Sequence, residues 1–308
     1  MKSTVAILLV LLLLTGMSSP LYSAGRIKVV TSTLDFADIA NRIGGDRVDV
    51  YPIFRGLTDV HFFEPVPSQV IKLKKADMLV VLGLDADIWV KSLIDASRNA
   101  KVKFGANGYV DPSDGITPIQ VPTGRIDGAM GDVHPYGNPH YWFTPDNLRI
   151  AVNNIYKGLA RVSPKDEEYF AKNRDAYLVQ VDKTFEEIAS LMAPFKGTGV
   201  IEYHQSWDYF CDFMGLKVVA TLEPKPGIPP SAKHLKTVVQ LARGMNTRLM
   251  LVEPYYPEKP VKYVQHETGI KVLRLPIYLT PKEKDEGILG LLLQDAKKIS
   301  EALSSNGS

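Results

Sequence analysis

Short apolar runs rich in β-branched residues alternate with amphipathic segments along most of this chain. In the first half, the pattern predicts strands at 27–32, 48–54 and 78–83. Helices are expected between and after them, at 34–43, 67–75 and 88–97. Strands that alternate with helices are typical of βαβ units, in which the strands pair in parallel and helices cover both faces of the sheet. The chain is therefore expected to be an α/β protein.

The alternation lapses between about residues 105 and 140, where Gly, Pro and Asp predominate and a long loop is expected. A helix is expected at 145–161. Ser163, Pro164 and Asp166 then form the signature of a helix start. The helix that they open is expected to run to about Leu191, a length of roughly 40 Å. Such a length is enough to connect two lobes.

The strand and helix signals resume after Pro194. Strands are expected at 199–203, 216–222, 248–253 and 270–275, and helices at 206–214, 231–244, 258–267 and 285–304. We therefore expect two parallel-sheet α/β lobes, at 26–162 and 194–308, joined by one long connecting helix at 163–193. Because open parallel sheets bind ligands beyond the carboxyl ends of their strands, the ligand site is expected in the cleft between the lobes.

The first 25 residues have the pattern of a secretory signal peptide. Lys2 supplies a positive charge, residues 5–14 form an apolar run too short to cross a bilayer, and small residues at 23–25 offer a cleavage site. The only cysteine is Cys211, so the cleavage region lacks the cysteine of a bacterial lipoprotein. The expectation is a cleaved, soluble protein of the bacterial periplasm.

The bulk composition excludes several classes of protein. The chain carries 36 Lys and Arg against 34 Asp and Glu, without a basic stripe, so no nucleic-acid partner is expected. A single cysteine excludes an intrachain disulfide, and stability must therefore come from a hydrophobic core, for which 45% apolar residues suffice. We expect a monomer.

Three histidines lie beside turns or at the ends of apolar runs, among aromatic residues and prolines. They are His61 in DVHFFEPVP, His140 in GNPHYWFTP and His204 in VIEYHQSWDYF. Neutral imidazole is the commonest protein ligand of zinc, and all three positions fall near the expected cleft. Glu253, which ends a strand of the second lobe, is the candidate fourth donor. Alternatively, each histidine is an ordinary loop residue or helix cap. Glu253 would then only brace the turn at Pro254.

The remaining histidines are expected to lie outside the site. His134 falls in the Gly-rich loop, where a plain loop residue is the favoured interpretation over a role in feeding metal to the site. His234 and His266 fall on helix faces and are expected to be solvated.

At these residues the chain resembles the metal-binding solute receptors of bacterial ABC importers, the cluster A-I or ZnuA/TroA-like family for zinc and manganese. The resemblance extends from near Thr31 to about Gly269, and its matching stretches are DVHFFEPVPSQVIKLKKADMLVVLGLDADIWV, NPHYWFTPDNL, YHQSWDYFCDFMGLKVV, LEPKPGIPPSAKHL and LMLVEPYY. It implies that His61, His140 and His204 are metal ligands and that the long helix is a rigid connector.

The chain departs from the family pattern at one point. The family usually has an Asp near the end of a late strand of the second lobe as its fourth ligand, whereas this region reads KVLRLPIYLTP, with no acid before Glu283. The fourth donor is therefore Glu253, another acid or water.

The function expected from these observations is capture of a divalent metal ion, Zn²⁺ or alternatively Mn²⁺, and its delivery to an ABC transporter permease in the inner membrane. Three imidazoles favour Zn²⁺, since Mn²⁺ prefers oxygen donors. The alternative is a secreted zinc-dependent hydrolase with Glu202 or Glu253 as general base. The chain lacks an HExxH pattern and a nucleophile motif, so an enzyme is not expected. A surface adhesin of the same fold is a third possibility, which the absent lipid anchor disfavours.

Overall fold

The computed structural model describes residues 25–124 and 134–305, and within them the strands form two parallel four-stranded sheets. The first sheet has the order β2-β1-β3-β4 and the second β6-β5-β7-β8. The strands of the first sheet are β1 (Ile27–Thr31), β2 (Val48–Pro52), β3 (Met78–Val80) and β4 (Tyr109–Val110). Those of the second are β5 (Gly199–Glu202), β6 (Lys217–Thr221), β7 (Thr247–Val252) and β8 (Lys271–Arg274). The expected α/β fold with two parallel sheets is confirmed.

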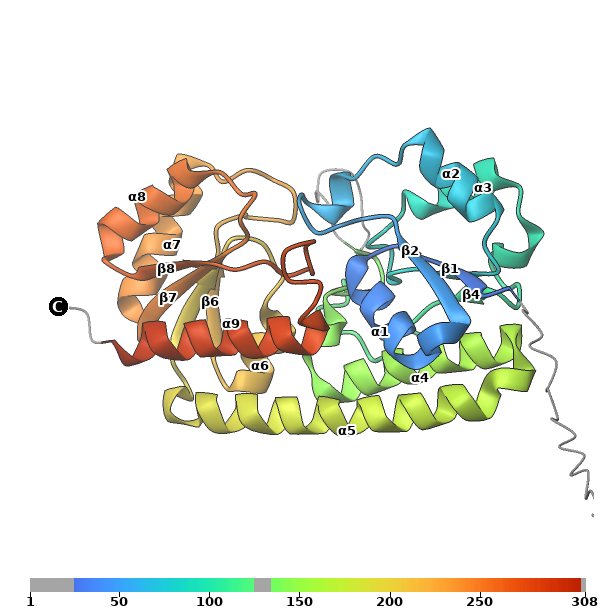
Figure 1. Ribbon diagram of the computed structural model, residues 1–308. Helices are drawn as coiled ribbons and strands as arrows, with labels where there is room; N and C mark the ends of the chain where they lie inside the picture. Colours follow the sequence, from blue (N-terminus) through green and yellow to red (C-terminus); the bar gives the residue numbers. More distant parts are fainter. Residues whose placement is uncertain (1–24, 125–133, 306–308) are drawn as a thin grey trace, which may run out of the picture.

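Helices connect successive strands within each sheet, and one more helix follows the last strand of each (Figure 1). In the first lobe the connecting helices are α1 (Leu34–Gly44), α2 (Pro67–Lys74) and α3 (Val90–Ser97), and α4 (Pro145–Val162) follows β4. In the second they are α6 (Asp208–Met214), α7 (Ala232–Gly244) and α8 (Glu258–Thr268), and α9 (Gly287–Ser304) follows β8. Local signals set their ends: the Thr33 hydroxyl accepts from the backbone of Phe36 to cap α1, which ends before Gly45 at a φ of 53°.

A 26-residue helix, α5 (Glu167–Met192), runs along one side of the molecule beneath both sheets (Figure 1). Phe170, Tyr177, Val181, Phe185 and Ile188 are buried along it at helical spacing. The stripe packs against α1 and α4 of the first lobe and against α6 and α9 of the second. The helix therefore links both lobes through one apolar face.

The carboxyl end of the chain holds the lobes together a second time. Helix α9 packs against α1 as well as α5, and Asp38 Oδ2 accepts from the backbone N–H of Ile288 at 3.1 Å. Asp35 Oδ1 accepts from the N–H of Leu279 at 3.0 Å. Two contact regions, along α5 and at α1, thus set how the sheets lie relative to each other.

An aromatic layer fills the space between the two sheets. Phe143 of the first lobe lies 5.6 Å from Trp207 of the second, and Trp142 lies 5.2 Å from Tyr278, measured between ring centroids. All four side chains are buried in one apolar cluster that includes residues of both lobes. The layer adjoins the candidate ligand His140, whose ring centroid lies 5.8 Å from that of Trp142.

Two local predictions differ from the structure. The region from 105 to 140, expected to be a loop, contains the short strand β4, whose two residues are too few to give a periodic signal. The long helix begins at Glu167 and not after Ser163, because residues 164–166 form a tight 3₁₀ turn in which the Ser163 hydroxyl donates to the Asp166 carboxylate at 2.6 Å. The lobe limits at 162 and 194 stay predictions.

The described part of the chain contains no helix with the length and apolarity that crossing a membrane requires. The expected signal peptide, residues 1–25, falls almost entirely outside the described residues.

Candidate metal centre

His61, His140 and His204 converge on one point between the lobes. One side-chain nitrogen from each histidine lies within 4.8 Å of the corresponding atoms of the other two. The ring centroids are 5.6 to 6.0 Å apart. Among the described residues, the group of donor atoms that gathers in this way contains these three histidines and no carboxylate.

His61 lies on a short 3₁₀ turn, Val60–Phe62, in the loop that follows β2. The Asp59 carboxylate caps this turn: Oδ1 accepts from the His61 N–H at 3.0 Å. Trp89 Nε1 donates to the carbonyl of Val60 at 3.0 Å. The other Asp59 oxygen accepts from the Tyr256 hydroxyl of the second lobe at 3.2 Å. The backbone under His61 is therefore held from both lobes.

His140 is buried at the end of the long connection into α4. Asn138 Oδ1 accepts from the His140 N–H at 3.0 Å and lies 3.0 Å from its Nδ1 atom. The Nε2 atom is buried and has no hydrogen-bond partner. Since Nδ1 is occupied by an acceptor, the proton is placed on Nδ1, and Nε2 is left with a lone pair facing the cluster.

His204 lies two residues after the end of β5 and is oriented by a carboxylate. Its Nδ1 atom lies 2.8 Å from Glu223 Oε2, and that oxygen also accepts from the Gly227 N–H at 3.0 Å. This is the carboxylate–histidine arrangement that fixes the tautomer and raises the basicity of a metal-binding imidazole. The metal-binding nitrogen of His204 is therefore Nε2.

Burial favours the neutral imidazole at His140 of the cluster and at the neighbouring His134. Burial lowers the pKa of His140 well below its usual value, and the neighbouring histidines lower it further. Burial also lowers the pKa of His134, to about 3. At His204 burial alone has the same sign, but the hydrogen bond and the charge of Glu223 outweigh it and raise the pKa. Protons therefore compete with a metal mainly at His204.

Glu253 is completely buried one residue after β7, at the same edge of the sheet as His204. Burial raises its pKa to about 7, and neither carboxylate oxygen has a hydrogen-bond partner among the described residues. A buried carboxylate without partners is costly unless a cation lies nearby. Its donor atoms do not join the three gathered nitrogens, so its role as a ligand stays a proposal.

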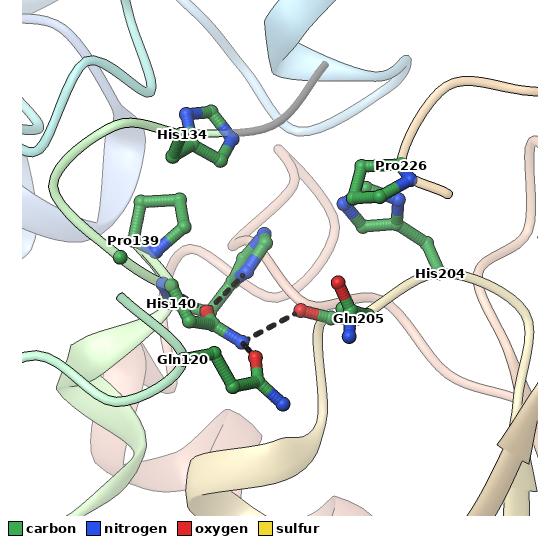
Figure 2. A pocket seen from close by; sticks show the side chains of 9 residues that line it. Gln120, His134, Pro139, His140, His204, Gln205 and Pro226 are labelled. Carbon is green, nitrogen blue, oxygen red and sulfur yellow. Dashed lines mark hydrogen bonds between the residues drawn. The ribbon is translucent and has the colours of Figure 1, made fainter. Parts of the chain in front are cut away.

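His134 is closer to the site than the sequence predicted. Its ring centroid lies 4.7 Å from that of His61, and its side chain lines the same pocket as His140 and His204 (Figure 2). His234 and His266 lie outside the three-histidine cluster and outside this pocket. His266 is exposed, as expected, whereas His234 is partly buried and its Nε2 lies 3.0 Å from the carbonyl of Thr221.

The pocket beside the histidines has a volume of about 40 Å³. Pockets for organic ligands are typically about 300 to 1,000 Å³, so this one has room for an ion or a water molecule only. Its walls come from both lobes: Gln120, His134, Gly137, Asn138, Pro139, His140, His204, Gln205 and Pro226.

Two residues that position ligands, Asn138 and Glu223, are not among the candidates that the sequence indicates. Glu223 Oε2 accepts from the Gly227 N–H in the loop after β6, and the same oxygen holds His204. Glu223 follows β6, which pairs with β5, so the rule that places ligand-binding residues after adjacent parallel strands would have found it.

A family model described as "Zinc-uptake complex component A periplasmic" matches residues 29–302, most of the chain. The chain belongs to this family.

Relatives of the zinc-uptake complex component A family agree with this assignment. The manganese ABC transporter substrate-binding lipoprotein PsaA of Streptococcus pneumoniae is 26% identical over 97% of this chain and 96% of its own length. The iron-binding protein YfeA of Yersinia pestis is 27% identical over 82% and 77%. A crystal structure of a ZnuA deletion mutant with zinc bound superposes with a TM-score of 0.77 at 26% identity, covering 92% of this chain and 100% of that one.

Members of the family are substrate-binding proteins of metal transport and not enzymes, which confirms that expectation. The names of the relatives include manganese, iron and zinc. Membership of the family therefore shows that the cargo is a metal ion, but it does not show which metal. Some relatives are named as lipoproteins, and export without a lipid anchor therefore stays a prediction.

Proposed function

We propose that this protein captures Zn²⁺ in the periplasm, as a soluble monomer, and delivers it to the permease of an ABC importer. The observation that supports the metal assignment most is the convergence of three imidazole nitrogens, from loops far apart in the sequence, in a group that holds no carboxylate from residues 25–124 and 134–305. Nitrogen donors suit Zn²⁺, whereas Mn²⁺ favours oxygen donors.

The surroundings of the three histidines support a site made for a bare ion. Asn138 and Glu223 hold the Nδ1 atoms of His140 and His204, so little ordering is needed when an ion binds. The buried Glu253 lies near His204 and supplies negative charge that offsets the charge of the ion. Glu253 is proposed either as the fourth ligand or as a neighbour that orients a ligand.

Mn²⁺ is the second candidate, because the PsaA relative is named for manganese. Elemental analysis of the exported protein, purified without added metal, distinguishes the two. Zinc at about one ion per chain supports the proposal. Manganese or iron at that stoichiometry, with zinc absent, contradicts it. An assay for peptide and ester hydrolysis on the same sample tests the hydrolase alternative.

Delivery to a permease is tested in the cell. Deleting the gene for this chain should slow growth when zinc is chelated, and added zinc should restore it. If manganese restored growth and zinc did not, the cargo would be Mn²⁺ and not Zn²⁺.

A further inference from the structure

The side chain of His134 has the features of a metal ligand that the three-histidine cluster does not include. It lies at the mouth of the cluster, with its ring centroid 4.7 Å from that of His61. Its ring is directed into the pocket that His140 and His204 also line (Figure 2). The Nε2 atom is buried and has no hydrogen-bond partner. A buried polar atom of this kind requires an explanation, since the loss of its partner carries a free-energy cost.

The backbone of Asp85 also acts on the His134 ring. Burial and the neighbouring histidines lower the pKa of His134, and the interaction with the Asp85 backbone raises it by less. Leu84 and Asp85 both have positive φ values, 50° and 60°, which residues other than glycine seldom adopt.

His134 shares with His140 the feature that marks a free ligand nitrogen. In each of these two histidines the Nε2 atom is buried and has no hydrogen-bond partner. In His140 the other ring nitrogen is engaged by Asn138, so Nε2 is the atom left for a metal ion. The buried Nε2 atom of His134 lines the same pocket and is left for an ion in the same way.

We propose that His134 is the fourth ligand of the cargo ion, so that four imidazole nitrogens bind it and Glu253 has the second of its two proposed roles, that of a neighbour of the ligands. This inference rests on the proposed function, since it concerns the ion that His61, His140 and His204 bind. The His134 donor atom is not among the three nitrogens that already lie within 4.8 Å of one another. Ligation therefore draws its ring toward the other three when the ion enters.

A site with four nitrogen donors suits fewer kinds of metal ion than a site with three. Four nitrogen donors suit Zn²⁺ and the late divalent metals of the same row in tetrahedral geometry, and they disfavour Mn²⁺. A shell of neutral imidazoles leaves the full charge of the ion in place. The buried carboxylates of Glu223 and Glu253 lie beside the shell and offset that charge without binding the ion.

X-ray absorption at the zinc edge, which counts imidazole ligands, tests the proposal on the full exported chain. The wild-type protein should give four imidazoles, and His134→Ala three imidazoles plus an oxygen. Zinc affinity, measured against a competing chelator, should fall by about tenfold or more in His134→Ala. His266→Ala removes an exposed histidine and is the matched control, with affinity and spectrum unchanged.

A cysteine substitution gives a new spectroscopic signal when its side chain binds the ion, so a misfolded variant cannot produce the expected result. His134→Cys, loaded with Co²⁺, should show a thiolate-to-cobalt band in the near ultraviolet, and His266→Cys should show none. Three imidazoles in the wild type and an unchanged affinity in His134→Ala would overturn the proposal while leaving metal capture intact. Failure of the wild type to bind zinc would overturn both this inference and the proposed function.

Discussion

The Nδ1 atom of His204 lies 2.8 Å from the Oε2 atom of Glu223, and both side chains are buried although 19 residues separate them in the sequence. His204 follows β5 and Glu223 follows β6, the neighbouring strand in the sheet. Parallel pairing thus brings a carboxylate to the back of an imidazole whose other nitrogen faces the cleft. The contact fixes both the orientation and the charge of this ligand.

Removing that carboxylate should weaken metal binding without removing a ligand. Glu223→Gln is expected to lower zinc affinity by about 10- to 100-fold, because the His204 ring loses the charge that raises its basicity. Competition with a chelator measures the change. Glu258→Gln, at an exposed position on α8, is the control and should bind zinc like the parent. An affinity equal to that of the parent in both variants would contradict the role of Glu223.

Acidification should release the metal in two stages. The pKa of His204 is raised and that of His140 lowered, so His204 is the first to be protonated as the pH falls. Affinity should begin to fall above a pH of about 6.5, the ordinary imidazole value, with about one proton taken up per ion released. At lower pH the zinc affinity should fall more steeply with pH, because His140 is then protonated as well.

Titration calorimetry in buffers of different protonation enthalpy counts these protons. Uptake of three protons together near neutrality would mean that the histidines titrate as ordinary surface groups. In Glu223→Gln the first stage should move to lower pH, since the raised pKa of His204 depends on Glu223.

Glu253→Gln should have opposite effects on the metal-bound and metal-free protein. The variant should lower zinc affinity, because the negative charge that offsets the ion is lost. Burial raises the pKa of Glu253 from 4.5 to about 7, so the folded state retains a proton that the unfolded state releases. The metal-free wild type therefore loses stability as the pH rises from 4.5 to about 7.

In Glu253→Gln this loss should be absent. At pH 8 its free energy of unfolding without metal should exceed that of the wild type by roughly 1 to 3 kcal/mol. Urea denaturation at pH 4 and at pH 8 measures the difference. A variant that binds zinc like the parent would mean that the compensating charge comes from another residue.

The hydrogen bond between Tyr256 and Asp59 joins the lobes over the site. Tyr256→Phe should lower the free energy of unfolding by about 1 kcal/mol, the ordinary contribution of one hydrogen bond. Because Asp59 also caps the turn that carries His61, zinc should dissociate faster from this variant. Tyr263→Phe, at a more exposed position of α8, is the matched control. Equal dissociation rates in the two variants would mean that Tyr256 does not help to close the site.

The sequence was sufficient for the parts of the fold and site that local patterns encode. Apart from the two-residue strand β4, the strands and helices follow from apolar periodicity. His61, His140 and His204 stand out as candidate ligands because each lies beside a strand or helix end among aromatics and prolines, and the structure gathers them. Glu223 was not identified as the partner of His204, because that pairing depends on which strands are neighbours. His134 lies in a Gly-rich connection without periodicity, and only the tertiary fold brings it to His61.

Calorimetric titration of the metal-free protein with Zn²⁺, in the wild type and in a variant with alanine at His61, His140 and His204, shows whether these histidines hold the ion. We expect one tight site per chain in the wild type and none in the variant, while the variant keeps the secondary structure of the parent. Equal zinc binding by the two proteins, or a wild type that binds no zinc, would contradict the assignment of the three histidines as zinc ligands.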